Sequence, residues 1–158
     1  MVRMRSVIVF LRRFLSGGTM WIGGLGKLVL LDSDILIALG RKNQDALRKI
    51  KELEKRNDSL ATTVFSEAEL FEGVYGSNDR EKTWAEVLTL LQDIPRIPFE
   101  DTAPQIAARI FYELKKRGAM IGTVDVFIAS IVLAGNDVLI TRNKKHFDKI
   151  PGLQIEEW

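Results

Sequence analysis

The chain has 158 residues, 46% of them hydrophobic, and a formal net charge of +2 from 23 basic and 21 acidic side chains. This length allows one compact domain with a proper core, and the near-balance of charge excludes a protein that coats nucleic acid through bulk positive charge. The sequence contains no cysteine and one histidine, which excludes disulfides, thiol nucleophiles, cysteine metal sites and two-histidine zinc sites. Carboxylates therefore remain as the main chemical resource, and the lack of cysteine fits a reducing cytoplasm.

Residues 1–27 are expected to form an N-terminal extension or linker before a single domain over residues 28–158. Arginines flank the apolar run at residues 7–11, but this run is too short for the hydrophobic part of a signal peptide, so we do not expect export. The glycines within residues 23–26 precede a predicted strand, whereas a dinucleotide-binding fingerprint follows one, which indicates a linker. Met20 is a candidate for the natural start.

Beyond the linker, short apolar runs alternate with stretches whose apolar residues recur at helical spacing. In chain order we predict a strand at 28–31, helices at 34–41 and 44–56, a strand at 60–63, helices at 64–74 and 81–91, a strand at 94–99 that Pro95 and Pro98 weaken, helices at 104–117 and 124–134, and strands at 138–140 and 153–155. This alternation indicates an α/β fold in which helices flank both faces of a central parallel sheet.

In an open parallel sheet, ligands bind beyond the carboxyl ends of the strands, so polar residues that follow the strands are candidates for a site. Asp32 directly follows the first predicted strand, and Thr141, Arg142 and Asn143 follow the strand at 138–140. The alternative role for Asp32 is an N-cap of the next helix. Its charge also interrupts an apolar stretch in a way that a membrane-spanning helix would not tolerate, so we expect no membrane partner.

Two further acids lie on predicted helices. Glu69 stands within a mainly apolar helix, between the core candidates Ala68 and Leu70, and Asp125 lies at the start of another apolar helix. The alternative for Glu69 is an exposed, solvated side chain. The alternative for Asp125 is an acid at a helix start that is favoured by the helix dipole.

Asp32, Glu69 and Asp125 are far apart in the sequence, but the predicted sheet allows them to converge at one edge. Carboxylates at close separation repel one another, so they either share protons or bind a hard cation such as Mg²⁺ or Mn²⁺ through their oxygens. A cation held in this way can activate water and neutralise charge on a leaving oxygen. The three acids therefore suggest hydrolysis of phosphodiester bonds.

These residues resemble the PIN-domain ribonucleases, and particularly the VapC-type toxins of prokaryotic toxin-antitoxin pairs. The resemblance spans about residues 28–158 and is carried by four segments in a fixed order. They are LLDSDILIAL at 30–39, ELFEG at 69–73, GTVDVFIA at 122–129, and residues 141–153, which contain TRN, HF and PGL. The resemblance implies a three-layer PIN-like fold and a metal-dependent endoribonuclease.

The resemblance also implies roles for the residues at the predicted strand ends and helices. Asp32, Glu69 and Asp125 match the acids with which the family binds Mg²⁺ or Mn²⁺ and activates water. Asn143 falls where many members carry a fourth acid, and its amide supplies a neutral oxygen in place of a charged one. Thr141 is expected to orient the acidic cluster through a hydrogen bond.

The same resemblance implies substrate contacts and partners. Arg142, Lys144 and Lys145 are expected to contact RNA phosphates, with a basic surface turn as the alternative. Asp34 either assists the acids or caps a helix. The family further implies a homodimer and an antitoxin protein whose C-terminal segment covers the acidic cleft with an arginine.

Two other functions remain open from the sequence. The segment LDSDIL at 31–36 looks like the nucleophile loop of haloacid-dehalogenase-like phosphatases, with Asp32 as nucleophile, although no paired aspartates occur near residues 138–143. Asn143 favours a non-catalytic PIN-like binding module, because it leaves the set of acids incomplete. For His146 we expect packing beside Phe147, since no acid or nucleophile is adjacent to it in sequence.

Overall fold

A computed structural model of the chain describes residues 26–158. Most of the predicted N-terminal extension over residues 1–27, including the candidate start Met20, lies outside the described residues. Gly26 and Lys27 lead into the first strand, and the Lys27 amide donates a hydrogen bond to the Asp58 carboxylate at 3.1 Å. This contact ties the entry of the domain to the start of the second strand.

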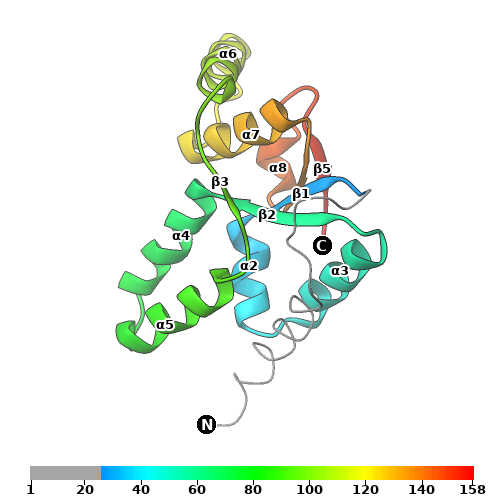
Figure 1. Cartoon of the computed structure of the whole chain (residues 1–158). Helices are drawn as coiled ribbons and strands as arrows, with labels where there is room; N and C mark the ends of the chain where they lie inside the picture. Colours follow the sequence, from blue (N-terminus) through cyan, green and yellow to red (C-terminus); the bar gives the residue numbers. More distant parts are fainter. Residues whose placement is uncertain (1–25) are drawn as a thin grey trace.

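Strands and helices alternate along the described chain, as the sequence predicts (Figure 1). In order, the elements are β1 (Leu28–Leu31), α2 (Ser33–Gly40), α3 (Gln44–Lys55), β2 (Ser59–Thr63), α4 (Val64–Tyr75), α5 (Arg80–Leu91), β3 (Arg96–Ile97), α6 (Ala103–Lys116), α7 (Thr123–Gly135), β4 (Val138–Ile140), α8 (Lys144–Phe147) and β5 (Gln154–Glu156).

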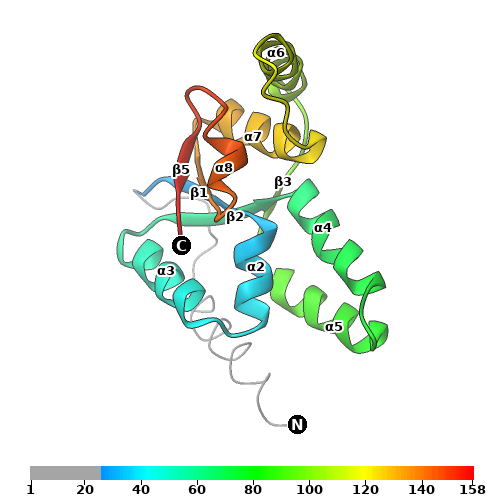
Figure 2. The same ribbon diagram turned by 180° about the vertical axis from the view of Figure 1, so that it is seen from behind.

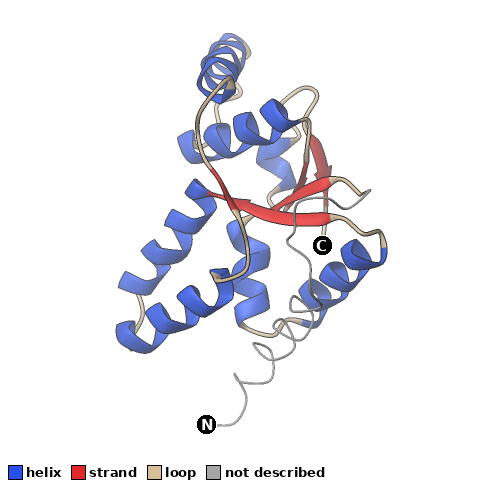
Figure 3. Ribbon diagram, viewed as in Figure 1, coloured by secondary structure: helices blue, strands red, loops and turns tan. Residues whose placement is uncertain are grey.

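The strands form one parallel sheet in the order β3-β2-β1-β4-β5, with β1 at its centre (Figure 3). Leu31 pairs with Thr62 of β2 on one side and with Ile140 of β4 on the other. The carboxyl ends of these three strands therefore lie level with one another. The residues that follow them are brought together at one edge of the sheet, as expected for parallel strands.

Alternate residues of the central strands enter two separate cores. Val29 and Leu31 pack with α2, α3, α4 and α5, whereas Leu30 packs with α6, α7 and α8. Figures 1 and 2 show these two groups of helices on opposite sides of the sheet. Successive side chains of a strand point to opposite faces, so a continuous apolar run fills both cores. The predicted three-layer α/β architecture is confirmed.

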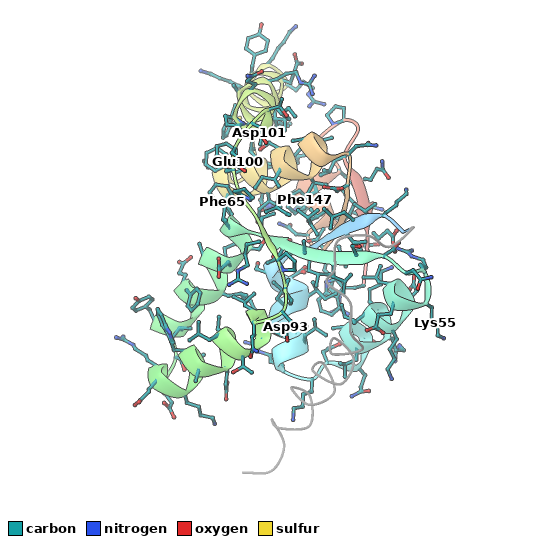
Figure 4. The ribbon with its side chains drawn as sticks, in the orientation of Figure 1. Lys55, Phe65, Asp93, Glu100, Asp101 and Phe147 are labelled. Atoms are coloured by element: carbon teal, nitrogen blue, oxygen red, sulfur yellow. The ribbon has the colours of Figure 1, made fainter. Side chains whose placement is uncertain are left out.

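Aromatic side chains fill part of the core beneath α6 and α7. The ring of Phe127 lies 5.1 Å from that of Phe65, 4.9 Å from that of Phe99 and 5.9 Å from that of Phe111, measured between centroids. Figure 4 shows Phe65 and Phe147 on the side of the sheet that these helices cover. This cluster fixes the start of α7, where Asp125 lies.

Ion pairs hold the last strand against α3 and β2. Glu156 of β5 accepts from Lys49 at 2.9 Å and from Arg56 at 3.0 Å, and Arg56 also pairs with the buried Asp58 at 2.6 Å. Burial alone would raise the pKa of Glu156, but the hydrogen bonds from Arg56 and Lys49 outweigh it, so this pKa is lowered. The ion pairs therefore anchor β5 although it is an edge strand.

Two elements differ from the sequence prediction. The strand predicted over 94–99 is reduced to Arg96–Ile97, because Pro95 and Pro98 flank it and cannot donate to a sheet ladder. Helix α8 was not predicted, because four residues are too few to show a helical period. Of its residues, Phe147 is buried in the core. Along the described chain, no helix combines the length and apolar character needed to cross a membrane.

Candidate active site

Asp32 lies at the centre of the candidate site. It directly follows β1, is 6% exposed, and caps α2 by accepting a hydrogen bond from the Ser33 amide at 2.8 Å. Its other oxygen accepts from the Thr141 hydroxyl at 2.7 Å. Burial raises the pKa of Asp32 to about 7; the charges of Asp34 and Glu69 also raise it, while the bond from Thr141 lowers it. Asp32 is thus both the N-cap of α2 and a buried acid whose pKa burial raises.

Thr141 directly follows β4 and is fully buried. Its hydroxyl donates a hydrogen bond to Asp32 and accepts one from the backbone amide of Asn143 at 3.0 Å. Leu31 and Ile140 are partners in the sheet, so the residues after them are neighbours. The predicted hydrogen bond from Thr141 to the acidic cluster is confirmed, and it also fixes the turn that carries Asn143.

Glu69 reaches the site from α4. The Ser33 hydroxyl donates to its Oε2 at 2.6 Å. Burial raises the pKa of Glu69, and the charges of Asp125, Glu72 and Asp34 raise it further, against the lowering effect of the Ser33 bond. Ala68 is exposed, so the prediction that it is a core residue is wrong, because it lies on the solvent side of a helix that buries Leu70.

Asp125 lies in the first turn of α7, and its side chain is 17% exposed. Its Oδ2 is 2.7 Å from Nδ1 of His146, and its Oδ1 is 3.4 Å from the amide nitrogen of Asn143. An ionised carboxylate only accepts hydrogen bonds, so Nδ1 of His146 carries the proton that it donates. Asp125 therefore has two side-chain donors, both from the segment that follows β4.

The prediction that His146 is a packing residue beside Phe147, without a contact to the site, is wrong. Its side chain is 42% exposed and faces Asp125, while the neighbouring Phe147 is buried. The short helix α8 turns the two residues in different directions. No local pattern in the sequence indicates this contact, because the partner acid lies 21 positions earlier.

Asp34 is held by the segment after β4 and by Trp158. Its Oδ2 accepts from the Arg142 amide at 2.6 Å, and its Oδ1 accepts from the indole Nε1 of Trp158 at 3.0 Å. The Arg142 guanidinium lies 3.6 Å from the centroid of the Trp158 ring and also contacts Asp45. The sequence gives no signal for Trp158. Lys144 and Lys145 are exposed beside this site.

The predicted acids are linked by their charges in pairs: Asp32 interacts with Asp34 and Glu69, and Glu69 interacts with Asp125. Within residues 26–158, no three acidic or histidine side chains are placed to hold one ion together as they stand. A shared ion therefore requires these side chains to turn toward one another. The oxygen-only donors and a buried acid whose charge is poorly compensated fit a hard divalent cation.

The family model of the PIN domain matches residues 29–153. Ribonuclease VapC2 of Rickettsia felis is 31% identical over 129 residues, which cover 82% of this chain and 96% of the relative. Ribonuclease VapC1 of Haemophilus influenzae strain R2866 is 30% identical with the same coverage.

Solved structures agree with these sequence relatives. The structure of VapBC2 from Rickettsia felis bound to a promoter DNA fragment matches with a TM-score of 0.77 and 28% identity, and covers 83% of this chain and 98% of that one. VapBC-1 from nontypeable Haemophilus influenzae matches with a TM-score of 0.74 and 31% identity, at the same coverage. The phosphatase alternative is set aside, because the family model and the relatives that match the chain are those of PIN-domain ribonucleases. The chain belongs to the PIN-domain family and, within it, to the VapC ribonucleases.

Proposed function

We propose that this chain is a divalent-metal-dependent endoribonuclease and the toxin of a toxin-antitoxin pair, with residues 28–158 as its nuclease domain. Asp32, Glu69 and Asp125 hold Mg²⁺ or Mn²⁺, and the chemistry that such an ion supplies is Lewis acidity and neutralisation of charge at the phosphate. The observation that carries this proposal is the burial of Asp32 beside other carboxylates, which raises its pKa to about 7. A buried acid in this state is stabilised by a cation.

The hydroxyl and amide donors hold the acids in place. Thr141 orients Asp32, Ser33 orients Glu69, and Asn143 together with His146 orients Asp125. Donors of this kind fix the direction of a ligand and tune its basicity. In this proposal Asn143 contributes through its NH₂ group, which explains how an amide serves where many members carry a fourth acid.

The exposed basic residues after β4 supply contacts to the RNA backbone. Lys144 and Lys145 lie beside Asn143 and His146, so their ammonium groups are placed to bind phosphates next to the acidic cluster. Arg142 is a weaker candidate for this role, because its guanidinium contacts Trp158 and Asp45.

The test is cleavage of single-stranded and structured RNA in the presence of Mn²⁺ or Mg²⁺. The Asp32→Asn and Asp125→Asn variants are expected to lose at least about a hundredfold in cleavage rate, the usual effect of removing a group that stabilises charge in the transition state. Asp93→Asn is a matched control, since this aspartate is exposed in the turn before β3 (Figure 4). Activity should also disappear with EDTA.

Equal cleavage by the wild type and both site variants would indicate a contaminating nuclease and would remove the proposal. A wild type that binds Mn²⁺ or RNA but cleaves no RNA would instead support the alternative of a non-catalytic PIN-like binding module. Calorimetric titration with Mn²⁺ in the absence of RNA distinguishes these results.

The solved relatives are VapBC complexes, which supports an antitoxin as a partner of this chain. We propose an antitoxin that covers the acidic cluster with an arginine, and a homodimer of the toxin itself, both in the cytoplasm, where the RNA substrate is found. Where a small upstream reading frame encodes a DNA-binding protein with a basic tail, co-expression with it should yield a complex that cleaves RNA more slowly than the free chain. Light scattering on the purified chain tests the homodimer, which a monomeric mass would exclude.

A further inference from the structure

Trp158 contacts the site through both its ring and its backbone. The indole Nε1 donates to Asp34 at 3.0 Å, the ring lies 3.6 Å below the Arg142 guanidinium, and the Trp158 carbonyl accepts from Nε of Arg142 at 2.9 Å. Trp158 follows β5, whereas Asp34 is on α2 and Arg142 follows β4. Three distant segments therefore meet at this side chain.

These contacts leave Asp34 engaged on both of its oxygens. Oδ1 accepts from Trp158, and Oδ2 accepts from the Arg142 amide at 2.6 Å. Asp34 adds negative charge at Asp32, and each of its oxygens accepts a hydrogen bond. Its bond to the Arg142 amide fixes the backbone between Thr141 and Asn143.

Trp158 is itself held firmly. Its ring packs against the core on the α2 and α3 side of the sheet. Two positions earlier, Glu156 is clamped by Lys49 and Arg56. The side chain that contacts Asp34 is thus attached both to the core and to the ion pairs that anchor β5.

We propose that Trp158 is a positioning residue for the proposed ribonuclease: through Asp34 and Arg142 it fixes the 141–143 turn, so that Thr141 and Asn143 reach their acids. The proposal rests on the proposed function. The turn supplies a donor to Asp32 and a donor to Asp125. A shift of this turn therefore disturbs two of the three proposed ligands at once.

The test compares Trp158→Phe with Trp84→Phe. Phenylalanine keeps a ring at position 158 but removes the N–H that Asp34 accepts. Trp84 is 41% exposed on α5 and packs on Phe71, so its replacement is a matched control for losing an indole outside the site. Trp158→Phe should lower kcat for RNA cleavage by about tenfold with little change in KM, the usual size of effect when a partner that orients a metal ligand is lost.

Two further measurements do not depend on RNA cleavage. Trp158→Phe should weaken Mn²⁺ binding in calorimetry by about tenfold. It should also shift the backbone amide signals of Arg142 and Asn143 in NMR spectra of the metal-free protein. Asp34→Asn should shift the same signals, and the double variant should add little to either single variant, because both changes break one connection.

The outcomes separate the two proposals. If the wild type cleaves RNA and Trp158→Phe behaves like Trp84→Phe in kcat, Mn²⁺ affinity and amide shifts, the positioning role is wrong while the nuclease stands. If the wild type cleaves no RNA, the nuclease fails, and the amide shifts alone decide whether Trp158 fixes the turn. Circular dichroism must show that each variant is folded.

Discussion

Nδ1 of His146 lies 2.7 Å from Oδ2 of Asp125, although 21 positions separate the two residues in the sequence. The contact links the start of α7 to α8, two elements that meet on the same face of the sheet. It supplies Asp125 with a charged or neutral N–H donor, whereas Asn143 approaches the other oxygen at 3.4 Å. Of the two side chains that contact Asp125, His146 therefore makes the shorter contact.

Replacement of His146 by leucine should lower the rate of RNA cleavage by about tenfold, because Asp125 loses its closest donor. His146→Gln should restore part of the rate, since its amide can donate to the same oxygen. The side chain is 42% exposed, so neither change should unfold the domain. A rate for His146→Leu equal to that of the wild type, measured at saturating Mn²⁺, would show that Asp125 does not need this partner.

Thr141→Val should reduce both stability and activity. Valine has nearly the same shape but cannot donate a hydrogen bond to Asp32. It also leaves the backbone amide of Asn143 without its acceptor. Loss of a hydrogen bond to a buried charged group costs about 1–3 kcal/mol, which urea denaturation can measure. Thr141→Ser keeps the hydroxyl and is the control. Equal unfolding free energies for the valine and serine variants would contradict the assigned role of the hydroxyl.

The metal-free protein should lose stability as the pH rises from about 4 to about 7. Asp32 ionises near 3.8 in the unfolded chain but near 7 in the fold, so in this window the folded state binds a proton that the unfolded state does not. The stabilising effect is complete below the unfolded pKa and is lost as the pH passes the folded one.

The Asp32→Asn variant isolates this effect, because asparagine does not ionise. In EDTA, its unfolding free energy minus that of the wild type should grow by a few kcal/mol, in order of magnitude, between about pH 4 and pH 8. Addition of Mn²⁺ at pH 8 should stabilise the wild type and have little effect on the variant. A difference that stays constant with pH would show that the fold does not raise the pKa of Asp32.

Phe127→Ala should destabilise the domain by about 2–4 kcal/mol, near the lower end for a large buried ring, because Phe127 is only partly buried. The ring contacts Phe65, Phe99 and Phe111. Phe127→Leu, which fills most of the volume, should cost clearly less. Chemical denaturation of both variants tests the order, and a larger loss for leucine than for alanine would contradict the packing described.

Much of the fold could be predicted because the signals are local. The apolar runs at Leu28–Leu31 and Val138–Ile140 form strands at the predicted residues, and Gly135 ends α7 where expected. The two elements that were predicted incorrectly also have local causes. Prolines shorten β3, and α8 is too short to show a period.

The site was harder to predict, because hydrogen bonds between distant residues depend on the tertiary structure. Asp32 and Thr141 follow apolar strands, so their proximity follows from a parallel sheet. The contact of His146 with Asp125 and the contact of Trp158 with Asp34 have no such pattern. The common role of Asp32, Glu69 and Asp125 as ligands stays a prediction that the cleavage and calorimetric experiments must decide.

Strand β1 lies between β2 and β4, so its amides are shielded by ladders on both sides, whereas β3 and β5 form the edges. The amide protons of Leu30 and Leu31 should therefore exchange with solvent only when the whole domain opens. Asp32 is attached directly to this slowly exchanging centre, while Glu69 and Asp125 are carried by helices on either side of it. Deuterium exchange should therefore be slower at the end of β1, next to Asp32, than in the helices that carry Glu69 and Asp125.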